Sequence, residues 1–292
     1  MQSIIWKQVD LTRRNGFLCP ARDSCMIETL EYEQVTQIRM SRELDGKPVY
    51  WVAAHLVDGL LIDTGCSHTS NELSAFLEGK DLRQVVNTHY HEDHMGGNHD
   101  IMSRYGVDVY AHPDSIPLIA RRFELYPYQE IAWGYPVPTT VKPVPTVLKT
   151  DHYTFQILDT PGHCIGHVCP VELSRGWCFT GDLFARENPK FIRPEENIGE
   201  IIRSMRKVIE LPTGRLILFT AVGKIVEDGR KALNQCISYL TDLAAKVQKL
   251  HGSGSTVDEI LINEFGGEHM FSQLTNGQFS TRSLVSSLLE TV

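Results

Sequence analysis

The residues with the clearest chemistry in this 292-residue chain lie in one short segment, 88–94, which reads THYHEDH. It holds three histidines and two acidic residues, and imidazole nitrogens and carboxylate oxygens are ligands that Zn²⁺, Fe and Mn²⁺ accept. Alternate residues of an extended segment point the same way, so His89 and His91 can face one cation. After a bend, Asp93 and His94 can face a second one. The segment predicts a metal site, and a solvated histidine-rich loop is the alternative.

Two further residues with ligand chemistry follow predicted strands. His163 comes after a Thr-Pro-Gly turn that follows the strand expected over 155–158, and Asp182 comes after Thr-Gly at the end of the strand expected over 177–179. A histidine on such a turn is a candidate third ligand, and a carboxylate at a strand end can bridge two cations. Taken alone, His163 is equally compatible with a turn histidine whose ring is satisfied by hydrogen bonds.

Together these motifs resemble the metallo-β-lactamase superfamily, whose signature is HxHxDH. The matching motifs are THYHEDH at 88–94, LLIDTG at 60–65, TPGH at 160–163 and TGD at 180–182. The resemblance covers roughly residues 45–230, and the Gly-His pair at 166–167 points to the glyoxalase II-like branch. It implies an α/β (α+β) fold, a four-layer αββα sandwich with the metals at one edge.

The resemblance also implies a role for each candidate residue. The expected metal ligands are His89, His91 and His163 on the first ion, Asp93 and His94 on the second, and Asp182 between them. Asp63 is similar to a carboxylate that orients a ligand histidine through its other ring nitrogen. His167 matches a position that is usually structural, and we do not expect it to bind metal. Zn²⁺ is the first expectation, one or two ions per chain, with Fe or Mn as alternatives.

One position departs from the family pattern. The family has another histidine after the last core strand, where this chain reads LFTAVGKIV over 218–226. The register set by IVEDG at 225–229 puts Val222 at that position, and an isopropyl group cannot ligate. Three explanations stay open: a weakened second site, a substitute ligand from His68 or His55, or an inactive chain.

Hydrophobic patterning indicates the elements that position these residues. Strands are expected over 49–57, 60–63, 82–87, 107–111, 155–158, 167–173, 177–179 and 215–219. Helices are expected over 70–77, from about 96–98, and over 114–123, 198–211, 228–250, 256–264 and 280–289. We expect a catalytic domain over 1–228 and a helical extension over 229–292, which packs on that domain, contributes to a homodimer, or only caps the structure. The proline- and aromatic-rich segment 124–144 is expected to cover the substrate, with a plain surface loop as the alternative.

The amino-acid composition of the chain limits the kinds of partner that the protein is expected to bind. The net charge of −8 disfavours nucleic acid, and no apolar run reaches the roughly 18–20 residues that cross a bilayer. Residues 1–14 lack the apolar stretch of a signal peptide, and the seven cysteines contain no CxxC pair. Reduced thiols and a cytoplasmic location are the expectation.

The working hypothesis is a metal-dependent hydrolase of a small-molecule thioester, lactone or carboxylic ester. A metal-bound hydroxide would attack the carbonyl, and Asp93 would orient it as the catalytic carboxylate. Two alternatives remain: a phosphodiesterase of the same fold, and a metal-binding protein with impaired or no turnover, which the Val222 departure would explain.

Overall fold

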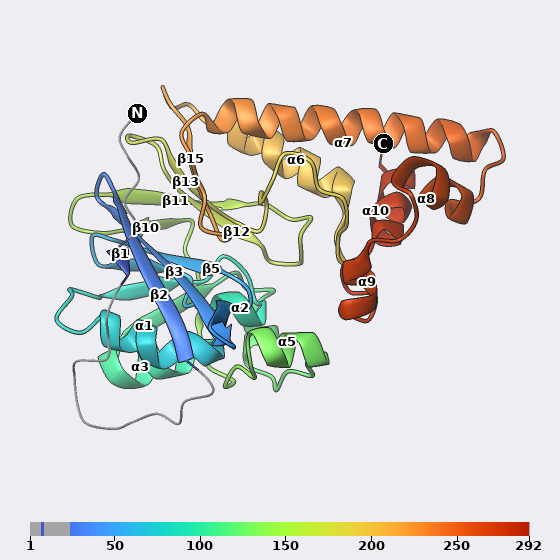
Figure 1. Cartoon of the computed structure of the whole chain (residues 1–292). Coiled ribbons are helices and arrows are strands. Elements are labelled where there is room, and N and C mark those ends of the chain that lie inside the picture. Colours follow the sequence, from blue (N-terminus) through green and yellow to red (C-terminus); the bar gives the residue numbers. More distant parts are fainter. Residues whose placement is uncertain (1–6, 9–23, 292) are drawn as a thin grey trace.

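The computed structural model describes residues 7–8 and 24–291. Two β-sheets lie face to face, and helices cover the outer face of each (Figure 1). The four-layer αββα fold expected from the resemblance is confirmed. Most of residues 1–14, on which the expectation of no signal peptide depends, and Cys19 lie outside the described residues.

Nine strands form the first sheet. They are β1 (Lys7–Gln8), β2 (Ser24–Tyr32), β3 (Val35–Leu44), β4 (Lys47–Pro48), β5 (Val52–Val57), β6 (Leu60–Ile62), β7 (Gln84–Val86), β8 (Asp108–Ala111) and β9 (Lys142–Pro143). Their order is β1-β2-β3-β5-β6-β7-β8-β9, and β4 pairs with β3. Neighbours from β1 to β6 are antiparallel, whereas β6 to β9 are parallel.

The second sheet has six strands in sequence order. They are β10 (Val147–Lys149), β11 (Thr154–Asp159), β12 (Val168–Glu172), β13 (Trp177–Gly181), β14 (Ile217–Thr220) and β15 (Ile225–Val226). All neighbours are antiparallel except β13 and β14, which are parallel.

Central strands are apolar on both faces because both faces are covered. In β6, Leu60 and Ile62 point into the core between the sheets, and Leu61 points to the helices outside. In β13, Phe179 faces the inner core and Cys178 faces the outer one. This two-residue alternation with apolar residues at every position is typical of a strand buried on both sides.

The helices form the two outer layers. They are η1 (Ser67–Thr69), α1 (Ser70–Phe76), α2 (Glu92–Met95), α3 (Asn98–Tyr105), α4 (Ile116–Ile119), α5 (Pro127–Ala132), α6 (Ile198–Ile209), α7 (Gly229–Gly252), α8 (Val257–Phe265), α9 (Met270–Leu274) and α10 (Thr281–Leu289). Residues of α1, α3 and α5 pack on the first sheet, and residues of α6, α7, α8 and α10 pack with the second (Figure 1). No helix in the described part of the chain is long and apolar enough to cross a membrane.

The C-terminal helices share a core with the second sheet. Leu284, Val285 and Leu288 of α10 are fully buried in the same cluster as Val171 of β12 and Cys178 of β13. The segment after residue 228 therefore packs on the sandwich and has no separate core among the described residues.

Some elements differ from the sequence-based expectation. No strand had been expected over 24–44, where β2 and β3 form a long hairpin at the margin of the first sheet. The chain is extended as a strand only from Val52, not from Val49, which is exposed. The helix expected over 114–123 is the single turn α4. The period-two hydrophobic pattern of this hairpin is interrupted, since the polar residues Gln37 and Ser41 are buried and Arg39 pairs with Glu28 across it.

Candidate metal centre

The candidate ligands all lie just after strand ends that meet at one edge of the sandwich. In the first sheet, parallel strands β6 and β7 lead into Asp63 and the 88–94 segment. In the second, β11 and β13 both pair antiparallel with β12, so they run in the same direction and lead into His163 and Asp182. β14 is parallel to β13 and leads into Val222. Topology therefore brings together residues that are far apart in sequence.

Three imidazoles form the first half of the cluster. His89 Nε2 lies 3.0 Å from His91 Nδ1, and the same His91 nitrogen lies 3.0 Å from His163 Nε2. All three side chains are buried. Buried imidazole nitrogens that converge on one point are costly unless a proton or a cation satisfies their lone pairs. This half of the cluster has the donors of a three-histidine metal site.

Asp182 connects this group to the second half. Its Oδ2 lies 3.4 Å from His163 Nε2, and its Oδ1 lies 3.6 Å from His94 Nε2. Asp93 Oδ2 lies 3.8 Å from that His94 nitrogen. The two carboxylate oxygens of Asp182 face different histidines, so this side chain could contact ions held by either group.

Asp63 fixes the orientation of His94. Its Oδ2 lies 2.8 Å from His94 Nδ1, which leaves His94 Nε2 facing the cluster. The same carboxylate accepts hydrogen bonds from the Thr88 backbone nitrogen at 2.7 Å and from Thr88 Oγ1 at 2.8 Å. Asp63 has φ of +61°, in the left-handed region, which Asp and Asn adopt more readily than most other residues with a Cβ. These contacts are the ones expected of an orienting carboxylate.

The turn that carries His163 packs tightly on the start of α6. Gly162 has φ of +128°, and a Cβ there would lie 2.5 Å from the backbone nitrogen of Ile201. The Asn197 backbone nitrogen donates to the Gly162 carbonyl at 2.7 Å. His163 Nδ1 lies 3.4 Å from Glu196 Oε2, so its Nε2 is the nitrogen that faces the cluster. Only glycine fits where the backbones approach so closely.

His167 supports the loop that carries Asp182. Its Nε2 accepts a hydrogen bond from the Asp182 backbone nitrogen at 3.2 Å, and its Nδ1 lies 2.9 Å from Thr160 Oγ1. A Cβ at Gly181 would lie 2.7 Å from His167 Nε2. Both ring nitrogens are engaged within the protein, in agreement with a structural position.

Burial keeps two of the imidazoles neutral. It lowers the pKa of His89 and of His91 well below the usual histidine value. Neighbouring histidines add to this effect for His89, and the Arg193 guanidinium adds to it for His91. A neutral imidazole has a free lone pair, which is the form that binds metal.

The second half of the cluster is crowded with carboxylates. Burial opposes the charged form of His94, but Asp63, Asp93 and Asp182 together raise its pKa well above the usual value. Burial raises the pKa of Asp93 to about 6; the charges of Glu92 and Asp182 add to this, and that of His94 opposes it. A nearby cation would lower the pKa of these carboxylates.

The residues present fit divalent cations. Asp93 Oδ1 is buried and has no hydrogen-bond partner, although a buried carboxylate oxygen ordinarily has one. Neutral imidazoles on one side and clustered carboxylates on the other supply nitrogen and oxygen donors of the type that Zn²⁺, Fe and Mn²⁺ prefer.

A cavity of about 140 Å³ opens beside the cluster. Asp93, His163 and Asp182 line it, and Val222 lies in the same wall. The Ala221 backbone nitrogen donates to the Gly181 carbonyl at 3.4 Å, so the turn that carries Val222 is next to the strand end that carries Asp182. An apolar side chain is therefore present beside the second ligand group.

Arg193 is a buried cation in the wall of this cavity. Its side chain is 6% exposed, and its nearest carboxylates, Glu92 and Glu195, each lie 3.8 Å away, beyond hydrogen-bond reach. Its Nε is buried with no hydrogen-bond partner. The guanidinium carbon lies 5.1 Å from the centre of the Phe279 ring. A buried guanidinium with unused donors can bind an anionic group.

The segment 124–144 reaches the site through α5. Gln129 Nε2 donates to Glu92 Oε1 at 2.5 Å, next to the candidate ligand Asp93. Trp133, the residue after α5, is buried and lines the cavity.

The two histidines considered as substitute ligands lie elsewhere. His55 Nε2 lies 3.2 Å from Gln37 Oε1, and its ring packs on Phe179 and Phe219 in the core between the sheets. His68 Nε2 lies 2.8 Å from the Glu130 carbonyl oxygen. Neither joins the described groups whose ligand atoms lie within 4.8 Å of one another, so the structure argues against both as surrogates.

Two residues of the site had not been singled out from the sequence. Cys164 is buried, and its Sγ lies within 4.8 Å of nitrogens of His89, His91 and His163. Its place directly after His163 was the available signal. Arg193 lies in an irregular segment between β13 and α6, and no sequence pattern distinguishes it from a surface arginine.

Comparison with known proteins gives a consistent result. The sequence profile of the Metallo-beta-lactamase superfamily matches residues 49–220, more than half of the chain. A hydroxyacylglutathione hydrolase of Pelagibacter ubique is 29% identical over 47% of this chain and 51% of its own length. A probable metallo-hydrolase of Bacillus subtilis is 29% identical over 47% of this chain and 62% of its own length. The matches thus span about half the length of these curated relatives.

Solved structures share the fold at low sequence identity. A metallo-beta-lactamase family protein from Thermus thermophilus has a TM-score of 0.61 at 15% identity and covers 88% of this chain and 92% of its own. A beta-lactamase domain protein from Burkholderia ambifaria has a TM-score of 0.60 at 16% identity and covers 91% of this chain and 84% of its own. These structural matches cover more of the chain than the sequence profile, which matches residues 49–220.

Proposed function

The chain belongs to the metallo-beta-lactamase superfamily, and from this premise we propose that it is a metal-dependent hydrolase of small thioesters or related esters. The observation that carries the proposal is the position of Asp182, whose two carboxylate oxygens face His163 and His94 at the wall of a cavity. Zn²⁺ is our first choice of ion, and Fe and Mn²⁺ are alternatives.

The proposed metal ligands divide between two ions. His89, His91 and His163 would hold one, and Asp93 and His94 the other, with Asp182 shared. Bound divalent ions would polarise the substrate carbonyl and lower the pKa of water. Asp63 would hold His94 in the orientation that presents Nε2 to the ion, a contact supported by the 2.8 Å distance.

Asp93 is the proposed catalytic carboxylate. Its Oδ1 has no protein partner and its side chain lines the cavity, so it can orient the attacking water and accept its proton. The water oxygen forms a bond with the carbonyl carbon, and the carbon–sulfur bond of the thioester breaks. The proton taken by Asp93 passes to the leaving thiolate, the second proton of the water is released to solvent, and the products are a carboxylate and a thiol.

Thioesters are the favoured substrates for two reasons. Relatives named hydroxyacylglutathione hydrolase support a thioester, although the matches are about 30% identical and partial. The cavity wall also contains Arg186, Lys190 and Arg193, which favour a substrate with a negatively charged part such as the carboxylates of a glutathione thioester.

The test combines metal analysis with a substrate panel. The purified protein, loaded with Zn²⁺, Mn²⁺ or Fe²⁺ in turn, is assayed on thioesters, lactones, carboxylic esters and phosphodiesters. We expect turnover of thioesters that a chelator abolishes and added metal restores. His91→Ala should lower the bound metal and the activity together. His99→Ala, on the exposed face of α3, is the matched control and should change neither.

Each alternative predicts a different outcome. Turnover confined to phosphodiesters would replace the thioesterase proposal with a phosphodiesterase. Stable metal binding without turnover on the whole panel would support a metal-binding protein, the reading that Val222 favours.

A further inference from the structure

The cavity beside the metal centre is also lined by members of the hydrophobic cluster that α6 and α7 share. Its lining combines the polar candidate ligands and the cations Arg186, Lys190 and Arg193 with apolar side chains of the 183–193 loop, α6 and α7. The apolar residues that matter here are Leu183, Ile198, Ile201, Met205, Cys236 and Leu240. All six are buried members of one hydrophobic cluster. The part of the cavity that these six side chains bound favours a hydrocarbon group over water.

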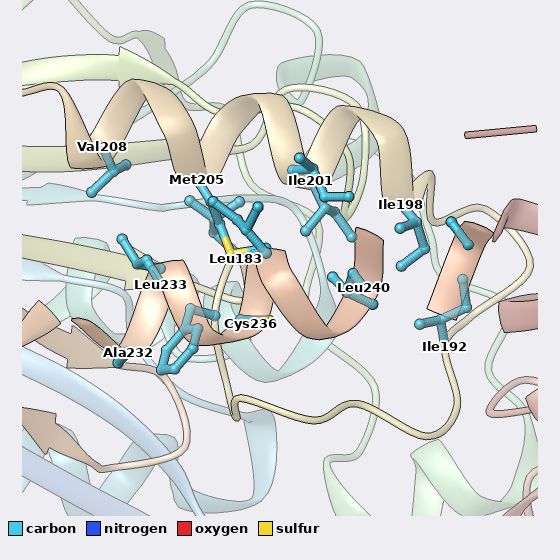
Figure 2. Close-up of a cluster of buried hydrophobic side chains, with 14 of the residues drawn as sticks. Leu183, Ile192, Ile198, Ile201, Met205, Val208, Ala232, Leu233, Cys236 and Leu240 are labelled. Carbon is cyan, nitrogen blue, oxygen red and sulfur yellow. The ribbon is translucent and has the colours of Figure 1, made fainter. Parts of the chain in front are cut away.

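Figure 2 shows the members of this hydrophobic cluster that α6 and α7 carry. Ile198, Ile201 and Met205 project from α6, Cys236 and Leu240 project from α7, and Leu183 lies between the helices. Val208 and Leu233 belong to the same cluster but do not line the cavity. The cavity is thus bounded by one part of the cluster, and the rest of the cluster is packed.

Other apolar side chains line the cavity besides these six. One is Val222, which lines it together with the candidate ligands Asp93 and Asp182. The rings of Phe191 and Phe279 also line the cavity with centroids 6.0 Å apart, and the Phe191 centroid lies 5.5 Å from that of the exposed Phe271 ring. A hydrocarbon chain could therefore enter past aromatic side chains.

We infer that this chamber, bounded by Leu183, Ile198, Ile201, Met205, Cys236 and Leu240, binds the hydrocarbon chain of an acyl substrate whose carbonyl lies at the metal centre. The inference rests on the proposed thioesterase function and adds the substrate class to it: acyl thioesters with an apolar chain, in place of small polar acyl groups.

The volume limits the length of the chain. An apolar cavity of roughly 150 Å³ holds a benzene molecule, and this cavity measures about 140 Å³. A chain that fills the cavity as benzene does has about six carbon atoms, so the favoured acyl group lies near this length, at about four to eight carbon atoms.

The test is a chain-length series of acyl thioesters with one common, uncharged thiol. We expect kcat/KM to rise about threefold to fourfold for each added methylene, as for burial of a CH₂ group, and to level off or fall beyond about eight carbons. Acetyl and lactoyl thioesters should be poor substrates. A profile that is flat, or that favours lactoyl over hexanoyl, would overturn the inference and leave the thioesterase proposal intact.

A matched pair of variants locates the chain. Leu240→Phe adds bulk to the chamber wall, whereas Leu233→Phe adds the same bulk to the same helix and cluster away from the cavity. Leu240→Phe should shorten the preferred chain, whereas Leu233→Phe should keep the wild-type chain-length profile. Leu240→Ala enlarges the chamber and should lengthen the preferred chain. This change of opposite sign tests the inference even if Leu240→Phe does not fold. Equal profiles for the two Phe variants would contradict the inference.

Binding of octanoate provides a readout that does not depend on turnover. Calorimetry on the wild-type protein should detect octanoate but not acetate, with at least about tenfold weaker binding in Leu240→Phe than in Leu233→Phe. If no acyl thioester is hydrolysed but octanoate binds in this pattern, the proposed function fails and the chamber stands. If octanoate does not bind, the inference fails.

Discussion

Asp63 and His94 are in contact across the ends of two parallel strands, with Asp63 Oδ2 2.8 Å from His94 Nδ1. The contact fixes which nitrogen of His94 faces the cluster. Two hydrogen bonds from Thr88 hold the same carboxylate in place. The orientation of a candidate metal ligand therefore depends on a residue that does not itself reach the proposed ions.

Asp63→Asn should weaken the second metal site with little effect on the fold. Asparagine tolerates the left-handed φ of +61°, but it removes the charge that supports His94. We expect metal affinity at that site to fall about 10–100-fold, which competition with a chelator measures. Asp45→Asn is the control, because Asp45 is exposed and has a φ of +51°. Equal metal affinities in the two variants would contradict the orienting role of Asp63.

The parts of the site that follow from local sequence were predictable. His89, His91, Asp93, His163 and Asp182 belong to motifs that follow strand ends, and parallel or alternating strands bring such ends to one edge. The hydrophobic patterns that end at these motifs are strong because both faces of the central strands are buried.

Other features could not be read from single segments. Whether His55 reaches the metal centre depends on the direction of its side chain in β5, which points into the core toward Phe179 and Phe219. The cavity is lined by Trp133 after α5, by the 183–193 loop and by residues of α6 and α7, so its shape depends on how these segments pack together. Arg193 is distinguished only by its burial in that wall.

The C-terminal extension should be required for folding of the proposed catalytic unit. We propose that residues 229–292 complete the outer layer of the domain over 1–228, because Leu284 of α10 is fully buried against that layer. Leu284→Ala should lower the free energy of unfolding by about 2–5 kcal/mol, measured by urea denaturation. Leu274→Ala, at a residue that is 61% exposed, should change it by less than about 0.5 kcal/mol. A small effect at Leu284 would indicate that α10 contributes little to the stability of the domain.

Arg193→Lys should impair binding of negatively charged substrates. Lysine keeps the charge near Glu92 but lacks the planar set of donors that a carboxylate can bind in pairs. For a thioester with a carboxylate on the thiol side we expect KM to rise about tenfold or more with a smaller change in kcat. An uncharged thioester should show no change. Arg206→Lys, exposed on α6, is the control, and equal effects on both substrates would contradict anion binding by Arg193.

Val222→His should strengthen metal binding at the second site. Val222 lines the cavity together with Asp93 and Asp182, so an imidazole at this position can face the ion that these residues would hold. Losing a ligand should cost at least the roughly 10–100-fold that losing an orienting partner costs, and restoring it should tighten binding by about that factor. Elemental analysis at limiting metal should then give closer to two ions per chain, and kcat should rise.

The matched control for this substitution is Lys224→His, which places an imidazole on the same turn at an exposed position. It should leave stoichiometry and kcat unchanged. If Val222→His folds normally and also changes neither, the register that puts Val222 at the family's histidine position is wrong. If metal content rises but kcat falls, the introduced imidazole binds the second ion, and Val222 in the wild-type protein contributes to substrate binding instead. This result is expected of a side chain that borders the acyl chamber.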